Sequence, residues 1–469
     1  MLRDLAAARG RAARRQLIAD VLSRLSVFRD DQRGAISAFM LVMLLTMFVA
    51  AGTAVDVMRH ETVRSALQNG LDRWALAPAS LDQTLAPEAV IAGCLHRTPY
   101  LDEPGAGDGE APGPRRGRFP PSRRIAASAR TDIDTIFLRL VGIPTLEVAA
   151  AAAAEHARQN VEISLVLDIS GTMAWEGRLQ NLIPAARSFI RRVLTPETAP
   201  YTTINLIPYA GSVNPGPELF ALLGGQRFHN QSSCIELGAA DFDETGLPAA
   251  GFYRQVPHFH WWPIRDDQEA YMDTGWCPSD ARMPIEIMSN DADRLVERIE
   301  GLRLHDGTGT HIGMKWALAL LDPGSNWAIG SLIAQGRVSP DFADRPKPWH
   351  DPESLKFIVL MTDGMISDQN RPAPPYLVEV TPDPIRGYDA RVHNAGKTTN
   401  RARFFQMCNA AKAHGVTVFT IAFEVPAANE WEMRDCASSP AHFFSVEGLS
   451  IADAFSQIAS TIENLKLVN

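Results

Sequence analysis

Several patterns that accompany catalysis are missing from this 469-residue sequence. It contains no His-Glu-x-x-His segment and no Cys-x-x-Cys pair, so the commonest zinc motifs are absent, and it has no Gly-x-Ser-x-Gly elbow for a nucleophilic serine. Lysine and arginine total 45 against 54 acidic residues, and no basic stripe is interleaved with aromatic residues. We therefore expect neither an enzyme nor a nucleic-acid-binding protein.

The placement of several histidines leaves a metal-dependent hydrolase as the alternative enzyme class. His305 and His311 lie around a Gly-rich loop, and His258 and His260 alternate in an aromatic-rich run. Alternation of this kind is typical of a strand-like segment whose side chains pack against the core or lie on the surface. Packing is therefore the favoured role for these histidines.

One long stretch lacks charge. Residues 35–55 contain no charged side chain and are rich in Leu, Met, Val and Phe, which suits the roughly 20 residues that a bilayer crossing needs. Residues 1–34 form a basic tail, and Asp56 follows the apolar stretch. The positive-inside rule puts the tail in the cytoplasm and everything after residue 56 outside. A secretory signal or a mitochondrial presequence is the alternative, but the tail is long for the first and contains acids, unlike the second.

The region after the predicted anchor divides into a stalk and a small module. Residues 56–77 have apolar residues near helical spacing, and Pro78 is expected to stop this helical stalk. Residues 78–156 are predicted to be a linker and a small β-rich module. Residues 103–124 are rich in Pro, Gly and Arg, which is typical of a linker. Short runs of apolar or small residues follow at 124–129, 135–140 and 145–154, and these runs are compatible with a β-rich module. Ala149–Ala154 fits a strand or a helix equally well.

Residues 157–469 alternate strands with helices. Strands are predicted at 162–168, 202–209, 356–362, 416–423 and 443–446, and helices at 178–194, 291–302, 311–321, 400–414 and 451–465. This alternation predicts an α/β fold with a doubly wound, mainly parallel sheet. Ligands bind such sheets at the carboxyl ends of the strands.

Two long insertions interrupt the pattern, at about 211–290 and 367–399. The first carries a cluster of aromatic residues: Phe252, Tyr253, Phe259, Trp261, Trp262, Tyr271 and Trp276. Long irregular loops are unusual unless they are functional, so both insertions are candidates for partner specificity. The alternative is that the aromatic residues form a satellite core of their own.

The five cysteines suit an oxidising compartment. Cys408 and Cys436 flank one predicted strand, and a bridge between them would tie the preceding helix to the following segment. Cys234 and Cys277 lie in the first insertion and could bridge it, which leaves Cys94 over. These pairings are hypotheses, since spacing does not fix connectivity.

Three separated segments carry oxygen-bearing side chains toward one edge of the predicted sheet. Asp168, Ser170 and Thr172 end the first strand at alternate positions, Thr310 ends a Gly-rich loop, and Asp363 ends a later strand. Carboxylate and hydroxyl oxygens suit a hard divalent cation such as magnesium. The simpler interpretation is that both acids only cap the helices that follow.

This constellation resembles the metal-ion-dependent adhesion site of von Willebrand factor type A domains, with Thr172 where that family usually has Ser. The resemblance implies that Ser170, Thr172 and Thr310 reach a magnesium ion, while Asp168 and Asp363 act directly or through water. Calcium and manganese are alternatives. One position would stay open for an acidic side chain of a protein partner.

The order of parts resembles TadG-like proteins of Tad (Flp) pilus assembly, through Arg33–Ile36, Leu71–Ala77, Cys408–Lys412 and Asp435–Ser438. The resemblance implies a bacterial inner-membrane protein with a periplasmic A domain that assembles or anchors pili. Prepilin peptidases favour Glu five residues after the cut glycine, but Phe39 follows Gly34, so the anchor is expected to stay intact. A generic envelope adhesin or scaffold with a structural metal is the alternative.

Overall fold

The chain divides into two compact units, residues 1–157 and residues 158–469. The structure, a computed structural model, describes residues 35–79, 122–157, 159–248, 251–374, 380, 383–385 and 390–465. The basic tail, Cys94 and most of the predicted linker lie outside these residues.

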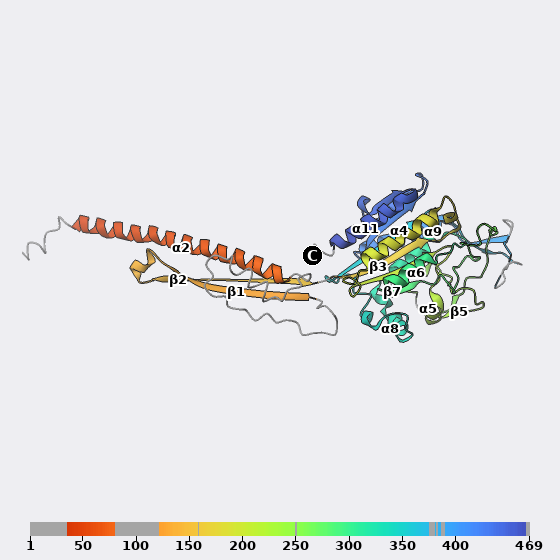
Figure 1. Cartoon of the computed structure of the whole chain (residues 1–469), viewed down its shortest axis with the longest axis horizontal. Coiled ribbons are helices and arrows are strands. Elements are labelled where there is room, and N and C mark those ends of the chain that lie inside the picture. Colours follow the sequence, from red (N-terminus) through yellow and green to blue (C-terminus); the bar gives the residue numbers. More distant parts are fainter. Residues whose placement is uncertain are drawn as a thin grey trace, which may run out of the picture. The chain divides into compact units, whose positions relative to one another are not determined.

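The described residues of unit 1 form one long helix and one hairpin (Figure 1). Helix α2 (Ala35–Ala79) is 45 residues long, and its segment from Ile36 to Asp72 is the one described helix that is long and apolar enough to cross a membrane. Strands β1 (Ser122–Asp134) and β2 (Thr145–Ala157) pair antiparallel without a register shift. The expected helical stalk is thus the continuation of the apolar helix, which runs through Pro78 to Ala79.

A narrow apolar seam joins the helix to the hairpin. Val63, Leu67 and Leu71 recur at helical spacing and pack against Ala129 of β1 and Val148 of β2. The alanine run in β2 is a strand, because its pairing with β1 and its contact with the helix outweigh the helix propensity of alanine. The predicted run 135–140 is not a strand: it enters the turn, where Leu138–Val141 form a 3-10 helix (η2).

Unit 2 is built on a six-stranded sheet in the order β12-β11-β8-β3-β4-β7. The strands are β3 (Asn160–Asp168), β4 (Thr202–Tyr209), β7 (Glu286–Ser289), β8 (Ser354–Thr362), β11 (Thr417–Phe423) and β12 (Phe443–Val446). The first five strands in this order run parallel, and β7 pairs antiparallel with β4 at the edge. The predicted doubly wound, mainly parallel sheet is confirmed, with the short antiparallel strand β7 added.

Two apolar layers sandwich this sheet. One layer packs α4 (Arg178–Val193), α6 (Ala292–Glu300) and α11 (Ile451–Leu465) against one face. The other holds α5 (Gly216–Leu222), α7 (Thr310–Ala319), α8 (Asn326–Ala334), α9 (Lys397–Ala413) and α10 (Trp431–Cys436). Both faces of β3, β4, β8 and β11 are therefore buried, which explains their mainly apolar sequences.

The two insertions pack against each other. Short strands β5 (Gly225–Gln226) and β6 (Tyr253–Arg254) pair in the first, and β9 (Gln369–Pro372) and β10 (Arg391–Ala395) pair in the second. Phe259, Trp261 and Trp276 form a satellite core with Ile385 and Ala390 from the other insertion. The alternative interpretation, a satellite core, thus holds for three of the seven aromatic residues, and both insertions contribute to that core, whereas Phe252 and Trp262 are exposed.

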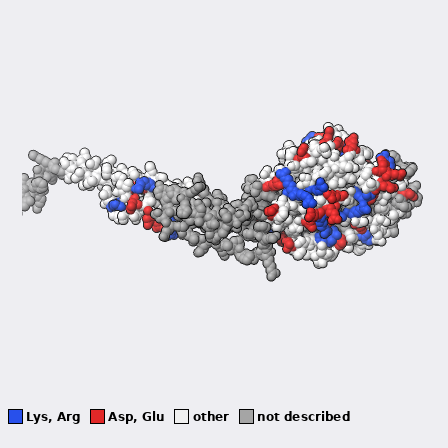
Figure 2. All heavy atoms as spheres, in the orientation of Figure 1, with Lys and Arg blue, Asp and Glu red and all other residues white. Residues whose placement is uncertain are grey.

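Both proposed disulfides are formed. Cys234–Cys277 lies inside this satellite core, and Cys408–Cys436 links α9 to α10. The surface of unit 2 mixes acidic and basic side chains, whereas the apolar part of α2 shows neither (Figure 2).

Candidate metal centre

The end of β3 lies between the ends of its neighbours β8 and β4, which converge on one carboxylate. Asp168 is fully buried, and its Oδ1 accepts a 2.8 Å hydrogen bond from the backbone N–H of Ser170. Its Oδ2 accepts from the hydroxyls of Thr362, at 2.7 Å, and Tyr209, at 3.1 Å. The first predicted ligand is therefore held rigidly by three strand ends.

The second carboxylate, that of Asp363, follows β8 directly. Its Oδ1 accepts a 2.7 Å hydrogen bond from the Thr172 hydroxyl, which in turn lies 3.0 Å from the Ser170 hydroxyl. Its Oδ2 accepts from a guanidinium nitrogen of Arg178 at 2.9 Å. Four of the predicted residues thus form one continuous polar cluster at the carboxyl edge of the sheet.

Thr310 reaches the same cluster from the Gly-rich loop. It begins α7, is fully buried, and its hydroxyl lies 3.4 Å from the hydroxyl of Tyr209. Gly309 allows this approach, because a Cβ there would lie 2.6 Å from the carbonyl oxygen of Gly211. The structure therefore brings all five predicted residues together.

The electrostatics of the cluster favour a bound cation. Burial and the nearby Asp363 charge raise the pKa of Asp168 to about 7. Burial also raises the pKa of Asp363, although Thr172 and Arg178 act in the opposite direction. Two desolvated carboxylates at one point disfavour each other's ionised form. A divalent cation would relieve both effects, so the donor set fits such an ion.

Hydroxyl groups are essential to this donor set. Within the described parts of the chain, no three His, Cys, Asp or Glu side chains are grouped so that they could hold a metal by themselves. Oxygen donors from Ser and Thr complete what two carboxylates begin, and such a set suits magnesium better than zinc.

Three residues of the cluster escaped the sequence analysis: Tyr209, Thr362 and Arg178. The first two end predicted strands, and Arg178 begins the helix after the Asp168 segment. A polar residue closing an apolar strand was the available signal for Tyr209 and Thr362. Arg178 had no comparable signal, because its ion pair with Asp363 joins residues 185 positions apart.

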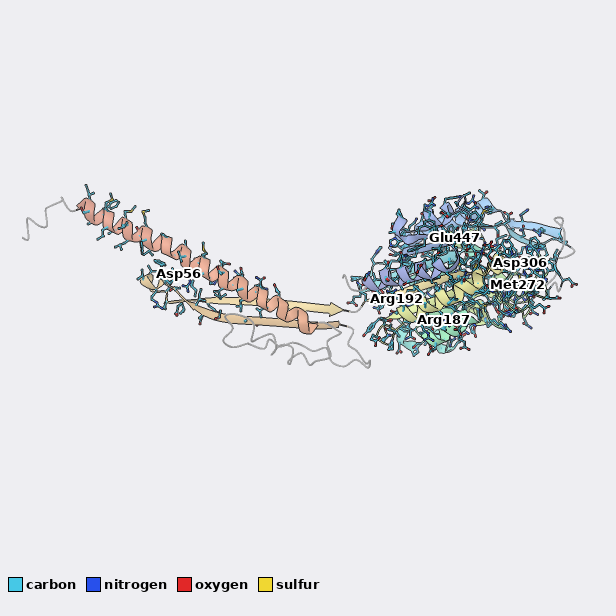
Figure 3. All side chains as sticks on the ribbon, turned by 45° about the horizontal axis from the view of Figure 1, so that its top comes forward. Asp56, Arg187, Arg192, Met272, Asp306 and Glu447 are labelled. Carbon is cyan, nitrogen blue, oxygen red and sulfur yellow. A yellow bond between two sulfur atoms is a disulfide. The ribbon has the colours of Figure 1, made fainter. Side chains whose placement is uncertain are left out.

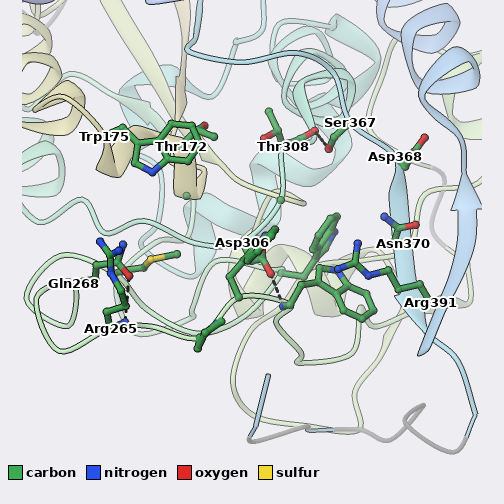
Figure 4. Close-up of a pocket in the computed structure, with 17 residues that line it drawn as sticks. Thr172, Trp175, Arg265, Gln268, Asp306, Thr308, Ser367, Asp368, Asn370 and Arg391 are labelled. Carbon is green, nitrogen blue, oxygen red and sulfur yellow. Dashed lines mark hydrogen bonds between the residues drawn. The ribbon is translucent and has the colours of Figure 1, made fainter. Parts of the chain in front are cut away.

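A pocket of about 620 Å³ lies against the cluster and shares Thr172 with it (Figure 4). Its wall carries Trp175, Trp261, Trp262 and Trp276, together with polar residues such as Arg265, Gln268 and Asp306. Trp175 and Trp262 are 58% and 66% exposed. The indole N–H of Trp261 is buried and makes no hydrogen bond within the described part of the chain.

The strand order of unit 2, with helices on both faces and an Asp-x-Ser-x-Thr segment at the carboxyl edge, defines a von Willebrand factor A-like domain. Residues 34–80 match the Tad family model, described as "Putative Flp pilus-assembly TadE/G-like". The similarity to this family is thus limited to the N-terminal segment, where the resemblance implied it. No curated protein matches the sequence significantly.

Several solved structures are similar at low identity. The von Willebrand factor domain of the type V pili tip protein Mfa5 from Porphyromonas gingivalis is 14% identical, covering 66% of this chain and 97% of that chain, with a TM-score of 0.36. The PilB minor pilin from Streptococcus sanguinis is 12% identical, with coverages of 73% and 75% and a TM-score of 0.33. Proximal thread matrix protein 1 from the mussel byssus, with a zinc-occupied MIDAS motif, is 12% identical, with coverages of 66% and 46% and a TM-score of 0.28.

Proposed function

We propose that this chain is a membrane-anchored, magnesium-dependent protein-interaction protein that acts in Tad (Flp) pilus assembly or anchoring. Helix α2 would cross the bacterial inner membrane with the basic tail in the cytoplasm and unit 2 in the periplasm. The TadE/G-like match and the basic residues before the apolar segment support this topology. Two disulfides in unit 2 suit an oxidising compartment.

The observation that carries the proposed interaction is the pair of buried carboxylates joined by hydroxyls. Asp168, Asp363, Ser170, Thr172 and Thr310 would hold the ion. When bound, magnesium supplies a coordination position that an acidic side chain of a protein partner can fill. The neighbouring pocket would receive an apolar or aromatic side chain of the same partner.

A structural role for the metal is the second candidate, and the complete burial of Asp168 and Thr310 favours it, because an ion between them would be enclosed by the fold. A metal that only stabilises the fold would raise the melting temperature without mediating any contact. Magnesium-dependent stability therefore cannot distinguish the two candidates, whereas partner capture can.

The test is capture of partners from an envelope extract by the full-length protein in detergent, with magnesium or with EDTA. We expect Asp168→Ala, Ser170→Ala and Thr310→Ala to abolish capture, the last two with modest loss of stability. Ser164→Ala is the matched control, because Ser164 is buried in the same strand but donates to the carbonyl of Ala317. Capture that survives both EDTA and Ser170→Ala would contradict bridging and leave the structural role.

A further inference from the structure

The turn of the β1–β2 hairpin is apolar and exposed. The hairpin tip, residues 135–144, has one charged side chain, Arg139. Its other large side chains are mostly uncovered: Ile136 is 56% exposed, Leu140 68%, Val141 55% and Ile143 45%. Four neighbouring aliphatic side chains in one turn form a patch that water does not favour.

The hairpin tip packs against the apolar part of α2. The Phe137 ring lies 5.8 Å from the ring of Phe48, and a Cβ on Gly52 would lie 2.2 Å from that Phe137 ring. Phe48 precedes the predicted end of the span, Val55, by seven residues, or about 10 Å of helix. The tip therefore lies beside helix that the bilayer would surround.

Helix α2 and the β1–β2 hairpin change from apolar to polar at the same level. Arg59 donates to the carbonyl of Asp134 at the start of the tip, and a ring nitrogen of His60 lies 3.2 Å from the carbonyl oxygen of Glu147 just beyond its end. Helix and hairpin thus share one boundary, although their sequences are unrelated. A membrane surface at this level would match both.

Backbone groups that enter a bilayer need hydrogen-bond partners, and the tip provides them. The buried carboxylate of Asp56 accepts from the backbone N–H groups of Ile136, Phe137 and Leu138 at 2.8 to 2.9 Å (Figure 3). The N–H groups of Leu140, Gly142 and Ile143 donate to carbonyls within the turn.

We infer that the hairpin tip inserts into the membrane interface beside α2, as a second contact of this chain with lipid. The inference rests on the proposed anchoring of α2. Ile136, Leu140, Val141 and Ile143 would lie among the acyl chains, while Arg139 reaches the headgroups. The insertion fixes the height and tilt at which the hairpin leaves the membrane.

Spin labels measure the predicted depth. Leu140→Cys is labelled in full-length protein carrying Cys94→Ser, since the other four cysteines form disulfides. The protein is placed in nanodiscs of phosphatidylethanolamine and phosphatidylglycerol. Relaxation by oxygen, which concentrates in lipid, is compared with relaxation by a water-soluble nickel chelate. Met40→Cys on the span and Ser128→Cys on β1, both exposed, are the lipid and water controls.

Oxygen-dominated relaxation at Leu140, as at Met40, supports insertion, and Val141→Cys should repeat it. Chelate-dominated relaxation at Leu140 with a lipid-exposed Met40 overturns the inference but leaves the anchor. A Leu140 label shielded from both reagents overturns it in favour of a protein contact. A water-exposed Met40 overturns the anchor, and the inference with it.

Discussion

Each unit of the chain buries a carboxylate, and the two are compensated in opposite ways. In unit 1, Asp56 is 1% exposed and accepts three backbone N–H groups of the hairpin tip. In unit 2, Asp168 is fully buried near a second carboxylate, that of Asp363. The hydroxyls of Thr362 and Tyr209 donate to Asp168, and the hydroxyl of Thr172 donates to Asp363. The first carboxylate is satisfied by the fold, and the second favours an added cation.

The donors around each carboxylate distinguish a structural acid from a binding acid when both are buried. Three amide donors on one carboxylate stabilise its charge without leaving room for a ligand. Hydroxyls can accept as well as donate, so those around Asp168 and Asp363 can turn their oxygens toward a metal ion. Asp56 should therefore ignore magnesium, while the cluster of unit 2 should respond to it.

The largest expected effect comes from removing the satisfied carboxylate. Asp56→Ala leaves three N–H groups of the hairpin tip without an acceptor, so the tip should detach from α2. We expect hydrogen exchange at Ile136–Leu138 to become at least about 100-fold faster. The measurement is exchange mass spectrometry of full-length protein in nanodiscs, with and without magnesium.

Asp72→Ala is the control, because Asp72 is an exposed acid on the same helix that accepts from Gln68. It should leave the tip unchanged. An equal response to both variants, or protection of the tip by magnesium, would contradict the contrast between the two carboxylates.

Local sequence predicted most of the sheet, because β3, β4, β8 and β11 are mainly apolar segments buried on both faces. Strand β7 was missed for a physical reason. It is four residues long, contains the buried Glu286, and pairs with β4 across a register irregularity. Its strand conformation comes from that tertiary pairing rather than from its own pattern.

The residues of the candidate metal centre likewise divide into those that the sequence predicts and those that depend on tertiary pairing. Asp168, Ser170 and Thr172 follow from two-residue alternation within one segment, and Thr310 and Asp363 from the family's order of motifs. Tyr209 and Thr362 contribute only because β3 lies between β8 and β4, and sequence alone does not reveal strand order. The structure thus confirms the grouping of the five residues, and their role as metal ligands stays a prediction.

The second prediction, with a smaller expected effect, concerns Arg178, whose positive charge partly compensates the carboxylates of the cluster. Arg178 is the cation nearest Asp363 in the described structure, and Arg178→Gln removes that charge. The metal-free protein should then be less stable, while magnesium should bind roughly 10-fold tighter because it no longer opposes a guanidinium. Melting temperature measured against magnesium concentration reports both changes.

Arg187→Gln is the matched control on the same helix, since Arg187 pairs with Glu300 on the surface. It should leave the magnesium dependence unaltered, as surface ion pairs contribute little. Weaker magnesium binding in Arg178→Gln would show instead that the guanidinium helps to build the site.

The smallest expected effect tests whether the pocket belongs to the binding surface. Trp262 is 66% exposed, so Trp262→Ala should leave the melting temperature and its response to magnesium unchanged. Loss of an aromatic contact beside the metal should still weaken binding of the captured partner about fivefold. Trp327→Ala is the control, because Trp327 is 45% exposed on α8 and does not line the pocket. If both variants bind the partner like the wild type, the partner contacts the metal edge alone. If both weaken it equally, the loss does not come from the pocket.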